Sequence, residues 1–320
     1  MARYTRNSAI LAKIETTYGD DAVPSGAANA VLISNLTANP LNANSIERDL
    51  IRPYFGASEQ LVGAAYKEVS FDVELAGSGA AGTAPAWGPL LRGSVFAETV
   101  NAGVSVDYTP ITDGQESLTI YYYRAGALHK LLGARGDCTL KTVVGTRPVF
   151  SFKFLGLDGG LTAAANPSLT LSAWKTPLSV SDANTGDLTF GCTYAAGALS
   201  GGTPYPSRGL ELPFGNSVEH TALLGGEGID VSNRQVSGTV ELDLTAAQEV
   251  TFMANVKANS TQSLGMVHGT AAGNKVLMYM PAVQLITPEY SDVNGRALVK
   301  YGLRVVPGAT GNDELRIVAL

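Results

Sequence analysis

The sequence predicts a mainly β protein, and three observations lead to this fold class. Glycine (36 residues) and proline (15 residues) are abundant among the 320 residues, and turn-forming pairs recur along the whole length. Nearly half of the residues (45%) are apolar and only 16% are charged, so the chain can fill a sizeable core. Several segments alternate apolar and polar residues with a period of two, which is typical of a half-buried strand. We therefore expect short antiparallel strands with short flanking helices, in a β-sandwich or barrel.

The first 60 residues show little periodicity. Residues 1–30 are expected to form an extension, in which 9–14 make one or two helical turns before the turn residues at 18–21. From residue 30 to residue 58, short apolar runs are separated by Asn, Pro and charges, which indicates an extended arm or a long loop.

The clearest strand of the first half covers residues 69–75. Its apolar residues alternate strictly with Ser70, Asp72 and Glu74, so we expect one buried face and one polar face. A glycine-rich segment follows at 77–82.

A short helix and four more strands are expected to complete the first half. The helix covers 84–92, because Pro85 suits a first turn and Gly93 suits a helix end. The strands are expected at 117–124, 129–132, 138–144 and 148–157.

The second half repeats this order. A strand at 236–244 carries Thr239, Glu241 and Asp243 on its polar face, and a helix at 245–256 follows with Thr245 as its cap. The remaining strands are expected at 264–268, 275–280, 283–287 and 296–306.

The order of elements therefore suggests an internal duplication. In both halves an acid-faced strand is followed by a helix, a hairpin, a strand, a glycine–arginine turn and a closing strand. The two turns are Gly145-Thr146-Arg147 and Gly295-Arg296. We expect an N-terminal arm and first domain in residues 1–160, and a linker region and second domain in residues 161–320.

Motifs for chemistry are weak in this sequence. Residues 77–82 match GxGxxG, but Asp72 and Glu74 lie just before them, whereas the first strand of a dinucleotide-binding fold is buried on both faces. The paired carboxylates on one strand face have the spacing of a glycosidase pair, but their repeated, similar setting favours a solvated polar face. The three histidines and two cysteines are scattered. We expect no enzyme activity, no catalytic residues, no cofactor and no metal.

Charge and hydropathy exclude further classes. The formal net charge of −6 argues against a surface that grips nucleic acid, because such a surface needs clustered Lys and Arg. No secretory signal and no stretch of about 18 apolar residues is visible, so we expect no membrane partner.

Four sets of short stretches share a further pattern: Leu11 to Gly19, Glu68 to Leu75 with Trp87 to Arg92, Gly136 to Leu140 with Gly145 to Phe152, and Asn312 to Val318. Together these stretches resemble the tail tube proteins of long, non-contractile-tailed bacteriophages (siphophages). They cover almost the full chain.

The resemblance implies two packed antiparallel sheets with a flanking helix, in subunits that form rings stacked head to tail. Single-domain members form hexameric rings, so a duplicated member needs three chains for the same pseudo-six-fold ring, with a hexamer as the alternative. The expected location is the virion tail, after synthesis in the host cytoplasm. The expected partners are other copies of the chain, the tape-measure, tail terminator and distal tail proteins, and double-stranded DNA in transit.

In such a ring, Ser70, Asp72, Glu74, Thr239, Glu241 and Asp243 are our candidates for residues that line the lumen. A negative lumen would let DNA slide during genome ejection. Residues 30–62 and 161–209 are our candidates for inter-ring arms and surface loops. The alternatives are another β-rich virion protein, such as a tail terminator or decoration protein, and a lectin-like β-sandwich.

Overall fold

The computed structural model describes residues 3–320, and in this part of the chain strands dominate. The elements of the first half are β1 (Ser8–Ile14), β2 (Ala30–Val31), β3 (Ser34–Ile46), β4 (Leu61–Glu74), α1 (Gly88–Arg92), β5 (Phe96–Asn101), β6 (Ser105–Pro110), β7 (Leu118–Arg124), β8 (Ala127–Val143) and β9 (Val149–Ala163). The elements of the second half are β10 (Leu188–Phe190), β11 (Thr193–Ala195), β12 (Ala198–Ser200), β13 (Thr203–Tyr205), β14 (Ser207–Pro213), β15 (Asn216–Leu223), β16 (Gly226–Arg234), β17 (Ser237–Leu242), α2 (Ala246–Lys257), β18 (Thr261–His268), β19 (Val276–Val293), β20 (Arg296–Val305) and β21 (Arg316–Ala319). The mainly β fold class is confirmed.

Within the described residues, seventeen strands form one continuous hydrogen-bonded sheet, and β11–β12 and β15–β16 form separate hairpins. The sheet folds around a core that contains residues from both halves of the chain. Aromatic rings fill its centre: Trp87 lies 5.2 Å from Phe150 and Phe96 lies 5.0 Å from Phe214, measured between ring centroids. Rings at these separations add to the stabilisation that burial of apolar area provides.

The two halves have the same strand order. Neighbouring strands of the first half follow the order β3-β4-β9-β8-β7-β1, with every pair antiparallel. Those of the second half follow the order β14-β17-β20-β19-β18-β10, again all antiparallel. A helix follows the second strand of each order, α1 after β4 and α2 after β17.

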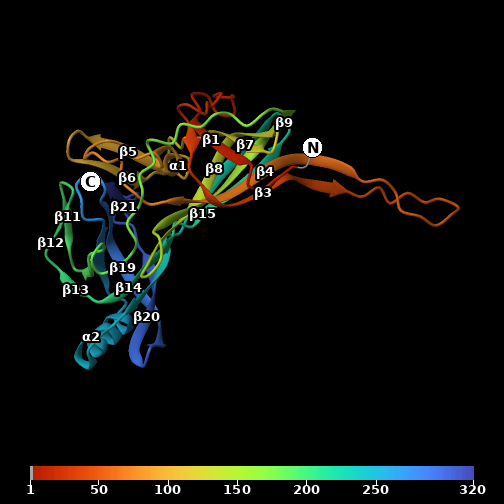
Figure 1. The fold of residues 1–320 in the computed structure, drawn as a ribbon. Coiled ribbons are helices and arrows are strands. Elements are labelled where there is room, and N and C mark those ends of the chain that lie inside the picture. Colours follow the sequence, from red (N-terminus) through yellow and green to blue (C-terminus); the bar gives the residue numbers. More distant parts are fainter. Residues whose placement is uncertain (1–2) are drawn as a thin grey trace.

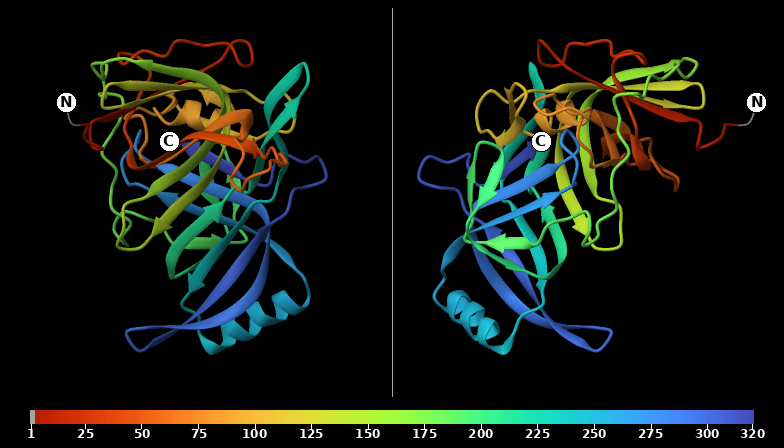
Figure 2. Two further views of the ribbon diagram at one scale, coloured as in Figure 1. Left: turned by 90° about the vertical axis from the view of Figure 1, so that its right-hand side faces the viewer. Right: turned by 60° about the vertical axis from the view of Figure 1, so that its left-hand side comes forward.

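One pairing joins these two sets of strands. Residues 209–213 of β14 pair with residues 139–143 of β8, and β21 adds a second link through its pairing with β6. The order β3-β4-β9-β8-β14-β17-β20-β19 is consequently a single sheet that crosses both halves (Figure 2).

The predicted arm at 30–58 is a β-hairpin. β3 pairs with β4 along most of its length, and the hairpin projects far from the body of the molecule (Figure 1). Apolar side chains are exposed toward its tip: Ile46, Leu50, Ile51, Tyr54, Phe55, Leu61 and Val62. β3 was not predicted from the sequence because both of its faces carry Asn, Ser, Thr and Ala, without the alternation that is typical of a half-buried strand.

The helical turns predicted at 9–14 are wrong, because these residues form β1. Ala9 and Leu11 face a small cluster with Tyr121, whereas Ile10 and Ala12 face the main core. A strand buried on both faces has a continuous apolar run, and such a run does not distinguish a strand from a helix.

Some predicted strands are parts of one longer strand, and one predicted helix is shorter than expected. The strands predicted at 129–132 and 138–144 are one strand, β8, whose pairing with β9 is irregular near Gly133. Those predicted at 275–280 and 283–287 are likewise parts of β19. The helix predicted at 84–92 is shorter, at Gly88–Arg92. The helix predicted at 245–256 is confirmed as α2, with Thr245 and Gln248 in a reciprocal capping box.

Glu15 and Tyr18 anchor the segment after β1 to distant parts of the chain. The Glu15 carboxylate is buried and accepts hydrogen bonds from Ser117 Oγ, Thr119 Oγ1 and the backbone N–H groups of Gly19 and Gly133, at 2.6 to 2.9 Å. The Tyr18 hydroxyl accepts a 2.6 Å hydrogen bond from the backbone N–H of Ile229 in β16. This segment therefore connects the first half to the second.

We expect Glu15→Gln to lower the free energy of unfolding by about 1–3 kcal/mol, because the amide NH₂ would face donors that need an acceptor. Urea unfolding of the dispersed subunit, followed by tryptophan fluorescence, measures the change. Glu59→Gln is the matched control, because Glu59 is exposed on the arm and its substitution should cost less than about 0.5 kcal/mol. Equal effects of the two substitutions would contradict the role given to Glu15.

Candidate functional site

The six residues predicted to line a lumen lie on one face of the sheet that crosses both halves. The pairing registers show which residues of neighbouring strands share this face. Asp72 is opposite Ser151 on β9, and Ser151 is opposite Thr139 on β8. On the same face of β8, Lys141 is opposite Glu211 of β14, and Glu211 is opposite Thr239 of β17. Residues opposite each other in antiparallel strands point to the same side. The structure therefore brings the two predicted sets together.

The other face of this sheet is the core. Between Ser70, Asp72 and Glu74 of β4 lie Phe71 and Val73, which are fully buried. The same alternation continues along the neighbouring strands, where the buried residues are Phe150, Phe152, Phe154, Leu140, Leu210, Leu212, Val240, Leu242, Tyr301 and Leu303. A shift of any strand by one residue would place charged side chains in the core, so the core fixes which residues the polar face presents.

Five ion pairs hold the carboxylates of this face to basic side chains. The pairs, with their N···O distances, are Glu68–Lys153 (3.2 Å), Glu74–Arg147 (3.1 Å), Lys141–Glu211 (3.9 Å), Arg208–Glu241 (3.4 Å) and Asp243–Arg296. Every pair is partly exposed, so each contributes little to stability. Their effect is on the surface itself, where carboxylates and cations alternate.

The glycine–arginine turns place equivalent ion pairs in the two halves. Arg147 follows the turn between β8 and β9 and pairs with Glu74 of β4. Arg296 follows the turn between β19 and β20 and pairs with Asp243, which lies just after β17. Gly145 and Gly295 have φ values of 81° and 83°, a conformation that favours glycine in such turns.

The middle carboxylates also have comparable partners. Asp72 accepts a 2.6 Å hydrogen bond from Asn35 Nδ2 of β3, whereas Glu241 pairs with Arg208 of β14 and accepts from Ser291 Oγ. In each half one partner comes from the strand that precedes the carboxylate strand in the sheet, and Ser291 of β19 is an additional partner of Glu241. The carboxylates are therefore held at defined positions on the face.

The predicted negative charge is accompanied by cations that the sequence prediction left out. Ser151, Lys153 and Lys141 share the face, and their alternation with buried residues in β8 and β9 was visible in the sequence. β14 and its Glu211 and Arg208 were missed because the segment follows a glycine-rich and proline-rich stretch. Lys300 and Arg304 are exposed on the same face of β20, with Lys300 in register with Glu289.

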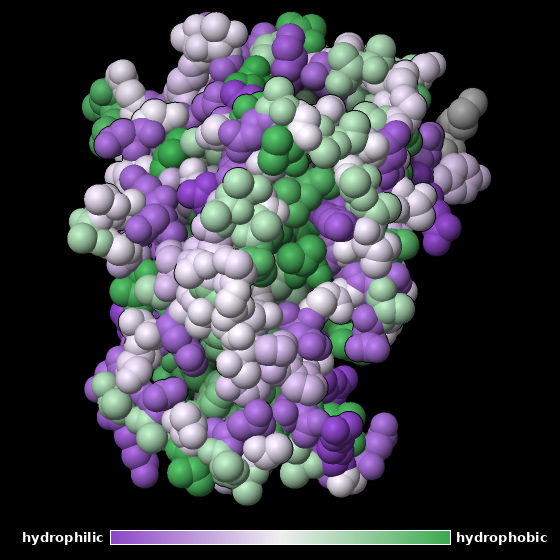
Figure 3. Space-filling view, turned by 90° about the vertical axis from the view of Figure 1, so that its left-hand side faces the viewer, coloured by the Kyte–Doolittle hydropathy of each residue, from purple (hydrophilic) through white to green (hydrophobic). Residues whose placement is uncertain are grey.

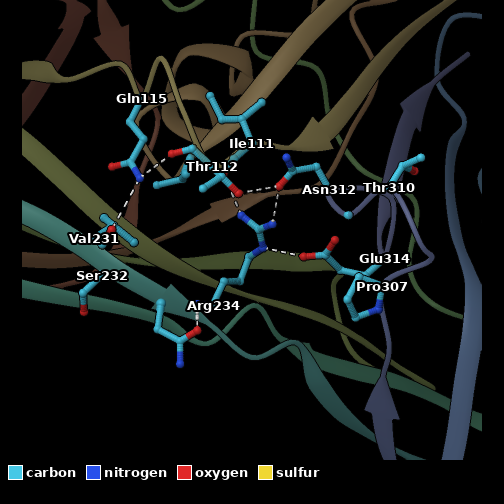
Figure 4. Close-up of a pocket in the computed structure, with 13 residues that line it drawn as sticks. Ile111, Thr112, Gln115, Val231, Ser232, Arg234, Pro307, Thr310, Asn312 and Glu314 are labelled. Atoms are coloured by element: carbon cyan, nitrogen blue, oxygen red, sulfur yellow. Dashed lines mark hydrogen bonds and ion pairs between the residues drawn. The ribbon is translucent and has the colours of Figure 1, made fainter.

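An open pocket of about 360 Å³ lies elsewhere, where the 111–115 segment, β16 and the 307–314 loop meet (Figure 4). Arg234 extends across it: Nε lies 2.6 Å from Glu314 Oε1, Nη1 donates to Ile111 O, and Nη2 donates to Asn312 Oδ1. The side chains of Arg234 and Glu314 are only 11% and 8% exposed. Since the charged groups of this pocket bind each other, we interpret the pocket as a structural junction between β16 and the 307–314 loop.

The GxGxxG segment also has a structural role. Gly77 N–H donates to Asn274 Oδ1 and Gly79 N–H donates to Gly273 O, both at 2.8 Å. A Cβ atom on Gly77 would lie only 2.1 Å from the Gly273 carbonyl oxygen, so the glycine permits this close approach. The segment thus attaches the loop after β4 to the turn before β19.

Neither a cluster of metal ligands nor a helix that could cross a membrane is found in residues 3–320. No group of three or more His, Cys, Asp or Glu side chains in this range could hold a metal ion. No helix in the same range is long and apolar enough to cross a bilayer. The side that carries β5, β6, β11 and β12 mixes hydrophobic and hydrophilic side chains, with hydrophobic ones gathered near its middle (Figure 3).

The fold and the polar face define a β-rich structural protein whose main feature is one sheet, apolar on the core side and ion-paired on the other. A family model for phage tail tube proteins matches residues 5–301, which is most of the chain. The chain therefore belongs to the phage tail tube protein family. It is a structural protein of the virion tail that assembles with copies of itself into a tube. No curated protein matches the sequence.

The two kinds of ion pair should differ in their contribution to stability. We expect Arg234→Ala to lower the free energy of unfolding by about 3–5 kcal/mol, because it leaves the Glu314 carboxylate buried without its partner. Arg147→Ala, which removes an exposed pair with Glu74, should cost less than about 1 kcal/mol. Urea unfolding of both variants tests this; a loss at position 147 as large as that at 234 would contradict it.

Proposed function

We propose that the chain is an internally duplicated siphophage tail tube subunit, and that three copies close into a pseudo-six-fold ring. The observation that carries the proposal is the shared strand order of the two halves, which are joined side by side in one sheet through β8 and β14. Two equivalent units per chain mean that six units need three chains. A ring of six chains is the alternative.

In this ring the polar face of the shared sheet lines the channel. The face is continuous across both halves, and the core covers its other side. Ser70, Asp72, Glu74, Thr239, Glu241 and Asp243 then lie in the channel wall.

The charge pattern of the face suits DNA in transit. Tight binding of DNA requires cations that are free to replace counterions on the phosphates. Of the seven cations named on this face, five are held by carboxylates of the same sheet, which lowers their ability to bind phosphate, whereas Lys300 and Arg304 form no ion pair within residues 3–320. The carboxylates would repel phosphates from the wall, so that double-stranded DNA slides during ejection.

The β3–β4 hairpin is our candidate for the inter-ring arm. Its apolar tip is exposed in the single chain, and burial of those side chains against a neighbouring ring would stabilise the stack. The 161–209 region, which includes the β11–β12 hairpin, supplies surface loops. In such a stack, the tape-measure, terminator and distal tail proteins are the expected partners in the interior and at the ends of the tube.

The assembly itself is tested by electron microscopy of the purified protein. We expect tubes with a regular axial repeat and three chains per ring. Single closed rings would instead favour a tail terminator or decoration protein, isolated monomers would favour a lectin-like β-sandwich, and six chains per ring would contradict the trimer.

The channel wall is tested by charge reversal in the phage. Substitution of Asp72, Glu74, Glu241 and Asp243 by Lys should slow DNA ejection, and higher salt should relieve the delay because it screens contacts with phosphate. The matched control reverses Asp113 and Glu219, which are exposed and lie outside the strands of the polar face. Intact tails with unchanged ejection would contradict the proposed role of the four carboxylates.

A further inference from the structure

Among the described residues, the strand order β3-β4-β9-β8-β14-β17-β20-β19 has an edge without a partner at each of its two ends. β3 pairs with β4 on one side only. Residues 289–293 of β19 pair with β20 on one side only. Exposed edges of this kind can pair with another chain.

These free edges are the counterparts of two edges that already pair with each other inside the chain. In the shared strand order, β3 has the position of β14, and β19 has the position of β8. β14 and β8 form the junction between the halves, whereas β3 and the end of β19 lie at the two outer edges of the shared sheet.

The registers define which residues correspond. Thr37 is opposite Ser70, and Glu211 is opposite Thr239, so Thr37 corresponds to Glu211 when the two acidic strands are superposed. On the other side of the first acidic strand, Asp72 is opposite Ser151, which is opposite Thr139. In the second half, Glu241 is opposite Lys300, which is opposite Glu289. Thr139 therefore corresponds to Glu289, and Lys141 corresponds to Ser291.

We propose that β3 of one copy pairs antiparallel with residues 289–293 of β19 of the next copy, with the register that β14 has on β8. Since Glu211 is opposite Lys141 within the chain, Thr37 lies opposite Ser291 of the partner subunit. Ala38 correspondingly lies opposite Tyr290 of the partner subunit. The inference rests on the proposed ring and names the contact that closes it.

The burial of corresponding residues supports this contact. At the junction within the chain, Leu212 is opposite Leu140, and both are fully buried. Their counterparts at the free edges are Ala38, which is half-buried, and Tyr290, which is 76% exposed although it lies on the core side of its strand. A second copy would cover both, and the small side chain of Ala38 leaves room for the large ring of Tyr290.

The polar side of the proposed contact is also compatible. Lys141 and Glu211 form an ion pair across the junction within the chain. Thr37 and Ser291 take their places; because Ser291 Oγ donates its hydrogen to Glu241, the cross-strand hydrogen bond would run from Thr37 Oγ1 to Ser291 Oγ. The contact therefore leaves no unpaired charge at these two positions.

Disulfide trapping tests the register. Side chains opposite each other in antiparallel strands have Cβ atoms about 4.5–5.5 Å apart, close enough for a disulfide after small adjustments. Thr37→Cys combined with Ser291→Cys should, on oxidation of assembled tubes, give covalent trimers and no larger species. The native Cys138 and Cys192 are buried and free, so they contribute little background.

Thr37→Cys alone and Ser291→Cys alone are the matched controls and should leave the chains uncrosslinked, because each presents a single new thiol to an unmodified edge. Ala38→Cys combined with Tyr290→Cys is a second pair that tests the opposite side of the same strands. Tubes in electron micrographs without crosslinks in either pair would overturn the inference and leave the ring proposal standing. Absence of rings and tubes in the unmodified protein would overturn both.

Discussion

The pairing of β14 with β8 is the constraint on which the architecture depends. Five consecutive residue pairs join strands from opposite halves of the chain, and through them two sets of strands become one sheet. The sheet can present an uninterrupted polar face only because this junction keeps every strand in phase with its neighbours. Loss of the junction would separate the two carboxylate strands, even if each half kept its own fold.

The polar face combines many weak interactions into one ordered surface. None of its ion pairs is buried, and pairs such as Glu74–Arg147 are individually of small energetic value. Stability comes from the opposite side of the same strands, where Phe150, Phe152 and Phe154 are packed. Charges on this face can therefore change at little cost to the stability of the fold.

Alternation identified the strands that carry Asp72 and Glu241, but β14 was missed although Glu211 lies between the buried Leu210 and Leu212. The polar faces of the strands with Asp72 and Glu241 and the capped helix after Thr245 follow from local patterns, whereas the joining of the two faces depends on the long-range pairing of β14 with β8. β3, β15 and β16 were not predicted, because polar residues on both faces of exposed hairpins erase the period of two. The pairing of Arg147 and Arg296 with carboxylates depends on tertiary packing, so the turns could be located but their partners could not.

The exposed apolar tip of the β3–β4 hairpin has a thermodynamic consequence for the free subunit. Side chains such as Ile51 and Phe55 are surrounded by water until another surface covers them, so their burial supplies a driving force that is largely entropic near room temperature. Such a driving force weakens on cooling. If burial of this tip drives polymerisation, subunits should dissociate more readily from the ends of the polymer at low temperature. The concentration of unassembled chains should then be higher in the cold.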